Sequence, residues 1–516
     1  MSKRKHAIEG YFQSGARLHA AGRLAEAEQV YRQILANAPN HADSLHMIGV
    51  IALQSGQPRA ALDYLDRALA LKPAAAMYHV NRANALLALR QPERAIDACH
   101  AALGFKRNCA EACQTLGHAL SDCGRTGEAI VAYQDALRHN PALPGLHNNL
   151  GLALRQADRL DEAATMLGQA VRRAPHDAEI RSNLAGVLKE LGSLPDAEAA
   201  YREALRVQPD NASLHFNLAL VLLLAGRFAE GWPEYEWRFR AGVARLPASE
   251  QPQWSGEALA GRTVLVRAEQ GYGDTIQFCH YVPMIAGGPV VLEVPARLRR
   301  LLGSLPGAPR IVASGEALPR FDLVCPLLSM PRLFDTAPGN VPYLAAEPER
   351  VAQWRSRIGS HGRRVGLAWQ GNPDSQAEQG RSIPLREFLP LAQVAGVRLI
   401  SLQRHHGLEQ LAAAPEVETL GEAFDAGADA FIDTAAVMQG LDLVITSDTA
   451  VAHLAGALGR PVWLALQHVP DWRWMLERSD CPWYPSMRLF RQTRRGDWGG
   501  VFARMAEELA MPGPLI

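Results

Sequence analysis

A short polar stretch near the end of the chain has the residue types that bind phosphates. Ser447, Asp448 and Thr449 follow an apolar segment at 441–446, and His453 comes four residues after Thr449. If a helix begins after Thr449, its first backbone N–H groups, the Thr449 hydroxyl and the His453 imidazole could together hold a nucleotide diphosphate. Asp448 could bind a sugar hydroxyl or hold the turn. An ordinary capped helix with a satisfied histidine is the alternative.

A second acidic candidate lies in a glycine-rich loop after an earlier apolar segment. The sequence EQGYGD at 269–274 places Gly271 and Gly273 just before Asp274. A carboxylate held on such a turn at the start of a helix could take a proton from an acceptor hydroxyl. A helix cap is the alternative. The loop lacks the third glycine of a dinucleotide fingerprint, and no P-loop sequence occurs, so NAD-type and P-loop functions are disfavoured.

Polar residues also follow the apolar segments at 365–370 and 398–403. Parallel sheets bind ligands at the carboxyl ends of their strands, so these residues are candidates for contacts with a nucleotide. They are Gln370, Asn372, Arg381, Ser382 and Gln403. Gln370 and Asn372 could contact a phosphate or a ribose, and Gln403 could contact the base.

The segment HVPDWRWM at 468–475 combines charged residues with two tryptophans. Asp471, Trp472, Arg473 and Trp474 could stack on a sugar or on the acceptor, with Asp471 and Trp472 as the expected acceptor contacts. Anchoring of the tryptophans in the core is the alternative. We expect no metal site: no Asp-x-Asp pair occurs, and Cys109 and Cys113, one helical turn apart, lack a second pair of ligands.

The elements that must position these residues alternate between apolar strands and helices. Strands are expected at 263–267, 289–294, 310–312, 321–325, 365–370, 398–403, 441–446 and 461–466. Helices are expected from 275 onward and at 348–358, 385–395, 450–458 and 500–509. Strands that alternate with helices form parallel sheets, so this part predicts two Rossmann-like halves, at 241–345 and 346–516, that face a cleft.

The first 240 residues repeat with a period of 34. Alanine recurs at Ala27, Ala61, Ala95, Ala129, Ala163 and Ala197, and a proline follows five of them by twelve residues. Small residues let two helices approach, and prolines end the second helix, so the pattern predicts stacked helix pairs. It resembles the tetratricopeptide repeat. A seventh first helix is expected at 212–224, and the aromatic segment after it, up to residue 240, is expected to cap the array.

A solenoid of such repeats presents a concave surface that suits a peptide or protein partner. Four asparagines recur on the expected first helices near the repeat period: Asn148, Asn149, Asn183 and Asn217. Their amides could clamp the backbone of an acceptor peptide in the groove. Solvated polar positions are the alternative for these residues, and a spacer or a dimerisation surface is the alternative for the array.

Composition narrows the function classes. The 516 residues suggest two to four domains, and the formal net charge of zero argues against a nucleic-acid binder. No apolar signal region follows the basic start, and no apolar run is long enough to cross a bilayer. Seven cysteines, an odd number without paired spacing, suggest reduced thiols. We therefore expect a cytoplasmic protein.

Four sequences in the second half carry a family resemblance. They are GYGDTIQF, VGLAWQGNP, RSIPLREF and SDTAVAHLAGALGRP. In this order they resemble glycosyltransferase family nine, the group of the lipopolysaccharide heptosyltransferases, from about residue 262 to the end. The resemblance implies a GT-B fold with the acceptor on the first half and a nucleotide sugar on the second. It also implies that Asp274 is the catalytic base and that Arg381 contacts phosphate.

The layout of repeats followed by such a region also resembles O-GlcNAc transferases, which modify proteins. Together these features predict an α superhelical tetratricopeptide array followed by an α/β GT-B unit with two Rossmann-like halves. The predicted activity is inverting transfer of a sugar from a nucleotide-diphosphate sugar to a hydroxyl of a protein held by the repeats, without metal or cofactor. A non-catalytic scaffold and a transferase acting on a lipid-linked glycan are the alternatives.

Overall fold

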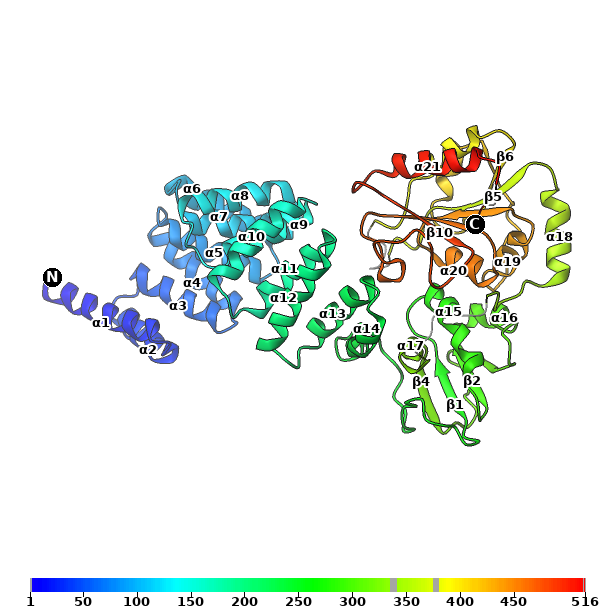
Figure 1. The fold of residues 1–516 in the computed structure, drawn as a ribbon. Helices are drawn as coiled ribbons and strands as arrows, with labels where there is room; N and C mark the ends of the chain where they lie inside the picture. The colour runs from blue at the N-terminus through cyan, green and yellow to red at the C-terminus, as the bar shows by residue number, and fades with distance from the viewer. Residues whose placement is uncertain (1, 335–340, 375–379, 514, 516) are drawn as a thin grey trace. The chain divides into compact units, whose positions relative to one another are not determined.

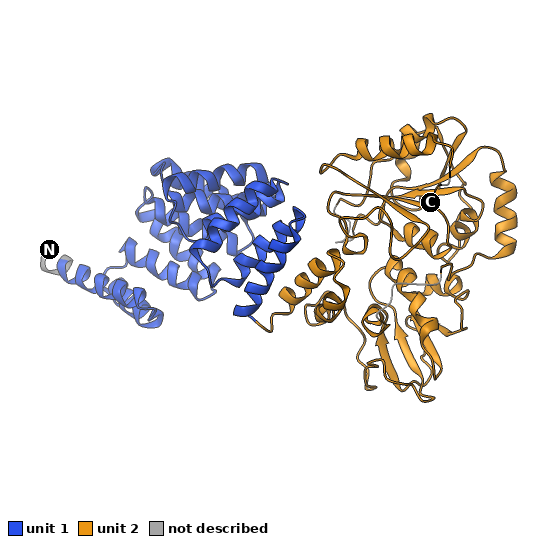
Figure 2. Cartoon of the chain, in the orientation of Figure 1, with its two compact units in different colours: residues 1–208 blue, residues 209–516 orange. Residues whose placement is uncertain are grey.

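The computed structural model describes residues 2–334, 341–374, 380–513 and 515. The chain divides into two compact units, Met1–Gln208 and Pro209–Ile516 (Figure 2). The sequence pattern placed the end of the first domain at residue 240. The structure assigns the helices after residue 208 to the second unit, because their aromatic side chains pack on its loops.

The first unit is a row of antiparallel helix pairs. Its helices are α1 (Ser2–Ala20), α2 (Leu24–Asn37), α3 (Ala42–Gln54), α4 (Pro58–Leu71), α5 (Ala76–Ala88), α6 (Pro92–Phe105), α7 (Ala110–Asp122), α8 (Thr126–His139), α9 (Leu146–Gln156), α10 (Leu160–Arg173), α11 (Ala178–Glu190) and α12 (Leu194–Val207). The small residues work as expected. A Cβ placed on Gly15 would lie 2.8 Å from the Tyr31 ring, and one on Gly49 would lie 2.8 Å from Leu65 Cγ. The close approach of paired helices therefore depends on these glycines.

The second unit begins with a helix pair that we call the cap, Ala212–Arg238. It consists of α13 (Ala212–Leu224), α14 (Phe228–Tyr235) and a 3-10 helix, η1 (Glu236–Arg238). Alanine recurs at this repeat position elsewhere, but the cap has Gly231. A Cβ there would lie 2.7 Å from Leu223 Cδ2, so the two helices of the cap are unusually close.

The first half after the cap contains a four-stranded parallel sheet. Its strands are β1 (Val264–Arg267), β2 (Val290–Val294), β3 (Arg310–Ala313) and β4 (Leu323–Pro326), in the order β3-β2-β1-β4. Its helices are α15 (Tyr272–Phe278), α16 (Arg299–Leu302) and α17 (Met330–Phe334). The chain leaves β1 toward β2 and β3 and returns on the other side of β1 as β4.

The second half contains a six-stranded parallel sheet in the order β10-β9-β8-β5-β6-β7. The strands are β5 (Arg363–Ala368), β6 (Val397–Ser401), β7 (Val417–Glu418), β8 (Leu443–Thr446), β9 (Val462–Leu466) and β10 (Met487–Arg491). The helices are α18 (Pro348–Ile358), α19 (Ile432–Met438), α20 (Ala450–Ala457) and α21 (Trp498–Ala510). In Figure 1, α18 and α21 flank this sheet, and α15 of the first half lies beside α20. The two parallel sheets confirm the expected α/β GT-B architecture.

Several elements differ from the expectation. The helix expected at 385–395 is a 3-10 helix, η6 (Leu385–Gln393), and Pro390 inside it cannot donate the hydrogen bonds of an α-helix. The helix expected from 275 onward begins at Tyr272. β7, β10 and α19 were not expected from the sequence, because they are short or lack a clear apolar period. Residues 375–379 of the loop between β5 and η6 lie outside the described residues.

Within the described ranges, none of the helices combines the length and the apolarity needed to cross a bilayer.

Candidate active site

A cavity of about 900 Å³ opens beside β1 and β5, where the strand order of each sheet reverses. The second half reverses its strand order in the same way as the first: the chain runs from β5 to β6 and β7 and returns on the other side of β5 as β8. Ligands of parallel α/β sheets bind at the carboxyl ends of strands at such switch points. The loops after β1, β5, β6 and β8 all contribute to the cavity wall.

The glycine loop after β1 approaches α20 of the other half very closely. A Cβ on Gly273 would lie 2.9 Å from His453 Cδ2 and 3.6 Å from Ala450 Cα. Gly271 lies at the end of the loop, and its N–H donates a hydrogen bond to Asp274 Oδ2 at 2.8 Å. Both glycines line the cavity as expected. Gly273 is needed for close packing of the two halves, and a Cβ on Gly271 would lie only 3.1 Å from Asp274 Oδ2.

Asp274 lines the cavity as the third residue of α15 rather than as its first. One carboxylate oxygen accepts the Gly271 N–H, which is the usual role of an acidic residue at this position. The other oxygen accepts a hydrogen bond from the guanidinium of Arg473. The side chain keeps 19% of its surface exposed. Gly271 is the N-cap residue of α15, so the expected N-cap role of Asp274 is corrected to that of a capping-box partner, which also lines the cavity.

Asp274 is the first member of a row of alternating charges, which we call the ion-pair chain. Its members are Asp274, Arg473, Asp471, Arg381 and Asp448. Arg473 donates to Asp471 Oδ1 at 2.8 Å, and Arg381 donates to Asp471 Oδ2 at 2.8 Å. Arg381 Nε lies 3.4 Å from Asp448 Oδ2. The ion-pair chain connects the loops after β1, β5, β8 and β9, so charge pairing joins the two halves.

Burial and charge pairing have opposite effects on the pKa values of the ion-pair chain. Burial alone would raise the pKa of Asp471, but Arg473 and Arg381 outweigh it and hold that pKa at about 2. Burial raises the pKa of Asp448, and Arg381 only partly opposes the shift. Burial would lower the pKa of Arg473, yet Asp471 and Asp274 raise it. The pair of Arg473 and Asp471 is therefore firmly charged, whereas Asp448 takes up a proton more readily than an exposed aspartate does.

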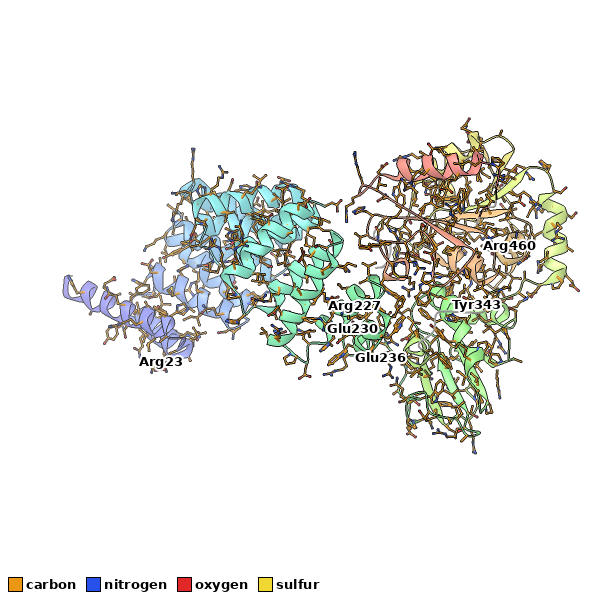
Figure 3. The ribbon with its side chains drawn as sticks, in the orientation of Figure 1. Arg23, Arg227, Glu230, Glu236, Tyr343 and Arg460 are labelled. Atoms are coloured by element: carbon orange, nitrogen blue, oxygen red, sulfur yellow. The ribbon has the colours of Figure 1, made fainter. Side chains whose placement is uncertain are left out.

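His453 is neutral at physiological pH. Burial lowers its pKa to about 3, and the nearby Arg473 adds to the shift. Its Nδ1 lies 3.1 Å from the Tyr484 hydroxyl, and its ring stacks on Trp474 with the centroids 5.3 Å apart. The hydroxyl of Tyr343, labelled in Figure 3, lies 3.4 Å from the Tyr484 hydroxyl. These contacts fix the imidazole at the cavity wall.

Thr449 precedes α20 with an extended backbone and also lines the cavity. Its hydroxyl lies 3.3 Å from Thr446 Oγ1, and it forms no capping bond to the helix within the described residues. Ala450 and Val451, the first residues of α20, line the same wall. The structure thus brings Asp448, Thr449 and His453 together, as the sequence predicts.

Two predicted serines point elsewhere. Ser447 is completely buried, and Ser382 accepts a hydrogen bond from the Gly371 N–H at 3.3 Å. We correct both predictions, because these hydroxyls belong to the core and to the loop rather than to a binding surface.

Gln403 also needs correction as a base contact, although it borders the cavity. Its oxygen accepts from the N–H groups of Trp369 and Gln370 at 2.9 and 3.1 Å. Its nitrogen donates to Gln370 O and His406 O at 2.7 and 2.9 Å. The amide is therefore used to hold two loops.

The predicted acceptor contacts in the loop after β9 are also wrong. Trp472 is only 5% exposed, and its ring packs against Trp232, Tyr235 and Phe278. Both oxygens of Asp471 are bonded to arginines. The alternative of core anchoring is the one that holds for the tryptophans.

Three other predicted residues do line the cavity. They are Gln370, Asn372 and Arg381. Gln370 Oε1 accepts from Gln410 at 3.2 Å, and Asn372 Oδ1 accepts from the Asp374 N–H at 3.1 Å. Among the described residues, neither NH₂ group of these amides has a hydrogen-bond partner, whereas the charge of Arg381 is shared between two aspartates.

The asparagines of the repeats have a role that neither expectation included. Asn149 Nδ2 lies 2.8 Å from His118 Nε2, and Asn183 Nδ2 donates to Asn148 Oδ1 at 3.0 Å. These bonds connect the first helices of neighbouring repeats. Asn217 is half-buried on α13 of the second unit. The amides thus stabilise the stacking of repeats, with part of their bonding capacity left over.

Arg404 and Arg297 are site residues that sequence reasoning missed, whereas Arg473 was expected only as a contact for sugar or acceptor and instead pairs with Asp274 and Asp471. Arg404 follows β6 and lines the cavity, and its Nε is buried without a hydrogen-bond partner among the described residues. Arg297 lines the cavity from the first half and donates to Ala428 O at 3.2 Å. We call Arg297, Arg404 and His405 the basic end of the cavity. The position of Arg404 directly after an apolar strand was the available signal.

Backbone strain also gathers at the cavity. Residues other than glycine rarely adopt positive φ, yet four that do so line this wall: Gln270, His405, Asp425 and Phe431, with φ of 63°, 73°, 44° and 66°. Such strain persists where the surroundings enforce it and is concentrated at functional sites.

Comparison with known families agrees with this geometry. Residues 46–110, 117–157 and 154–215 match models of the tetratricopeptide repeat. Residues 389–466 match the model of glycosyltransferase family 9 (heptosyltransferase), a range that includes β8, the turn at Asp448 and α20. The chain thus carries tetratricopeptide repeats followed by a glycosyltransferase family 9 domain.

Individual relatives cover parts of the chain. Protein FlbA of Caulobacter vibrioides is 33% identical over 322 residues, which is 56% of this chain and 53% of that protein. The chain spans about half the length of this curated relative. A thermophilic tetratricopeptide repeat protein of Thermus thermophilus is 26% identical, with a TM-score of 0.31 over 35% of this chain and 99% of its own. PilF of Pseudomonas aeruginosa is 17% identical, with a TM-score of 0.38 over 46% of this chain and 99% of its own.

Proposed function

We propose that the protein is a glycosyltransferase that moves a sugar from a nucleotide-diphosphate sugar to a hydroxyl of a protein bound by the repeats. One observation carries the proposal. Asp274 of the first half and the turn of Asp448, Thr449 and His453 in the second half line one cavity at the switch point of both sheets. A base and a phosphate-binding helix start that line the same cavity are what a direct sugar transfer requires.

In this proposal Asp274 takes the proton of the acceptor hydroxyl as its oxygen attacks the anomeric carbon. The bond from that carbon to the phosphate oxygen breaks, and the nucleotide diphosphate leaves with the electron pair. A single displacement of this kind inverts the anomeric centre. The bonds from Gly271 N–H and Arg473 fix the carboxylate in direction while part of it stays exposed. A fixed base saves the cost of orientation during the reaction.

Positive charge for the leaving group comes from the protein in this proposal. The charge of Arg381 is already shared by Asp471 and Asp448. Arg381 therefore stabilises the leaving phosphates less than its position after β5 suggested. Arg404 and Arg297 have no ion pair among the described residues and line the same cavity. Together with the start of α20 they would neutralise the phosphates without a metal ion or cofactor.

The repeats would hold the acceptor protein. Tetratricopeptide repeats suggest interaction with proteins, since stacked helix pairs offer an extended surface for an extended chain. The chain is electrically neutral overall, which gives no reason to expect nucleic acid as the partner. We place the reaction in the cytoplasm, where nucleotide sugars are made.

The substitution Asp274→Asn tests the assignment of the base. The amide keeps the shape and can still accept the Gly271 N–H, but it cannot take a proton. We expect turnover to fall about 10²- to 10⁴-fold, the usual contribution of a general base, with donor affinity nearly unchanged in calorimetry. Asp480→Asn is a matched control, since that side chain is 72% exposed and lies outside the cavity. Full turnover by the Asp274→Asn variant would contradict the assignment.

Two further measurements separate the proposal from its rivals. Calorimetric titration of the wild-type chain with a panel of nucleotide sugars should give binding to at least one; no binding to any would favour a scaffold. Mass spectrometry of candidate proteins co-expressed with the chain should show a sugar adduct. Adducts only on a lipid-linked glycan would contradict the protein acceptor.

A further inference from the structure

The cap Ala212–Arg238 contacts both loops that carry the ion pair between Asp274 and Arg473. We propose that the cap is a positioning element for the transfer reaction: Arg238 and Tyr235 hold the glycine loop of Asp274, and Trp232 and Tyr235 hold the loop of Arg473. The inference rests on the proposed function and adds residues outside the cavity to it.

Arg238 is the anchor of the glycine loop. Its side chain is completely buried, and it donates to Glu269 Oε1 and Ser329 Oγ, both at 2.7 Å. It also donates to Glu236 Oε1 at 2.8 Å, and Figure 3 labels Glu236. Glu269 lies two residues beyond β1 and is 2% exposed. Two buried charges that depend on each other hold the loop firmly, because either one alone would be costly.

Tyr235 holds the next residue of the same loop. Its hydroxyl accepts a hydrogen bond from Gln270 Nε2 at 3.2 Å, and Gln270 has the left-handed φ of 63°. Gly271 then donates its N–H to Asp274. Three consecutive residues are thus fixed in turn, the first two by the cap and the third by Asp274. The strained backbone at Gln270 would relax without the outer contacts.

The same face of the cap supports the opposite loop. The Trp472 ring lies edge-on to Trp232 with the centroids 5.3 Å apart and 5.9 Å from Tyr235. The guanidinium of Arg473 stacks over Trp472 at 4.2 Å. Trp472 lies between Asp471 and Arg473 in sequence, so the cap contacts the backbone segment that carries both charges. Tyr235 therefore contacts both loops that the pair of Asp274 and Arg473 joins.

Catalysis is sensitive to such support, because a misplacement of about 1 Å in a reacting group can cost about 10²-fold in rate. Tyr235 and Arg238 act through Gln270 and Glu269, so they are positioning residues rather than catalytic ones. Their loss should lower the rate of the chemical step and leave donor affinity largely intact.

Full-length variants test this inference. Tyr235→Phe removes one hydroxyl and keeps the ring, and we expect kcat to fall about five- to tenfold, as for one lost hydrogen bond, with the donor KM within about twofold. Arg238→Met should lower kcat about 100-fold, and Arg238→Lys should recover part of the loss by restoring the pair with Glu269. Arg240→Met is the matched control, since Arg240 is exposed and stacks on Trp237 within the cap. Unchanged kcat in Tyr235→Phe and in a folded Arg238→Met would overturn the inference, as would an equal loss in Arg240→Met.

Hydrogen exchange gives a readout that does not need activity. Peptides covering 268–276 and 469–476 should exchange faster in Arg238→Met than in the wild type or in Arg240→Met, while peptides of β8 and β9 stay the same. Unchanged exchange in both loops would overturn the positioning role even in a transferring enzyme. If the wild-type chain transfers no sugar but the two loops loosen as expected, the proposed function fails and the structural role of the cap stands.

Discussion

The two ends of the cavity differ in how their charges are satisfied. Along the ion-pair chain each carboxylate lies against a guanidinium, from Asp274 to Asp448. At the basic end, Arg404 has no ion pair among the described residues, and its Nε is buried without a partner. A guanidinium that the protein has already neutralised serves to position its partners. One without a counter-ion is available to an anionic ligand.

This difference bears on the predicted phosphate contact. The resemblance to a known family pointed to Arg381, and the position of that residue in the cavity agrees. With all its groups ionised, however, the ion-pair chain has three carboxylates and two guanidiniums, so an anion next to it meets net negative charge. The basic end attracts the same anion. We therefore expect the phosphates of the donor nearer to Arg404 than to Arg381.

The largest effect should follow from breaking the ion-pair chain at its centre. Arg473→Met leaves Asp274 and Asp471 without their shared partner in a buried site, so we expect the free energy of unfolding of the second unit to fall by about 3–5 kcal/mol and transfer to be lost. Tryptophan fluorescence in a denaturant titration reports on this unit alone, because all ten tryptophans lie after residue 208. Arg386→Met, at an arginine that is 79% exposed, is the control. A loss of activity without a loss of stability would mean that Arg473 binds substrate rather than supports the site.

The next effect separates the two ends directly. Arg404→Met should weaken donor binding about 10- to 100-fold, the value of one or two hydrogen bonds to a charged group, and leave the fluorescence unfolding curve unchanged. Arg381→Met should do the reverse, with lower stability and a smaller change in affinity, because two aspartates lose their partner. Calorimetry and denaturation of both variants decide the matter. A larger loss of donor affinity in Arg381→Met than in Arg404→Met would refute the assignment of the donor phosphates to the basic end.

The sequence predicted the repeat unit better than the site for a physical reason. In the repeats each contact recurs every 34 residues, so Gly15 with Tyr31 and Gly49 with Leu65 express one rule twice. Even the seventh first helix, α13, has the expected bounds. The contact of Arg473 with Asp274 occurs once, between residues 199 positions apart. No local period or propensity encodes such a pair.

The corrected site residues share a second cause. A strand followed by polar residues indicates a place where a ligand could bind, but it does not predict which side chains face the ligand. Ser447 turns into the core, while its neighbour Asp448 reaches the cavity. Gln403 satisfies four backbone groups of the loops beside it, so a polar side chain in the right place is not free for a ligand. Arg404, the next residue, is the one that remains available.

The smallest expected effect concerns His453 and the pH dependence of the free energy of unfolding of the second unit. His453 is neutral in the folded chain, with its pKa lowered to about 3 by burial and by Arg473. The unfolded chain takes up a proton on the same group near its ordinary pKa of about 6.5, so it binds more protons than the folded chain below that pH. Stability of the second unit should therefore fall as the pH drops from about 6.5 toward 3. For this residue alone the slope approaches about 1.4 kcal/mol per pH unit.

The variant His453→Gln isolates this contribution, because glutamine can still bond to the Tyr484 hydroxyl but does not titrate. Its fluorescence unfolding curves should depend less steeply on pH than those of the wild type between about pH 4 and 6, and the two chains should run parallel above about pH 7.5. His280, whose pKa burial lowers to about 4, keeps part of the slope in both chains. Identical slopes would mean that His453 is protonated in the folded protein. In that case the wall carries a positive charge, and the contrast between the paired and the basic end is smaller than the geometry indicates.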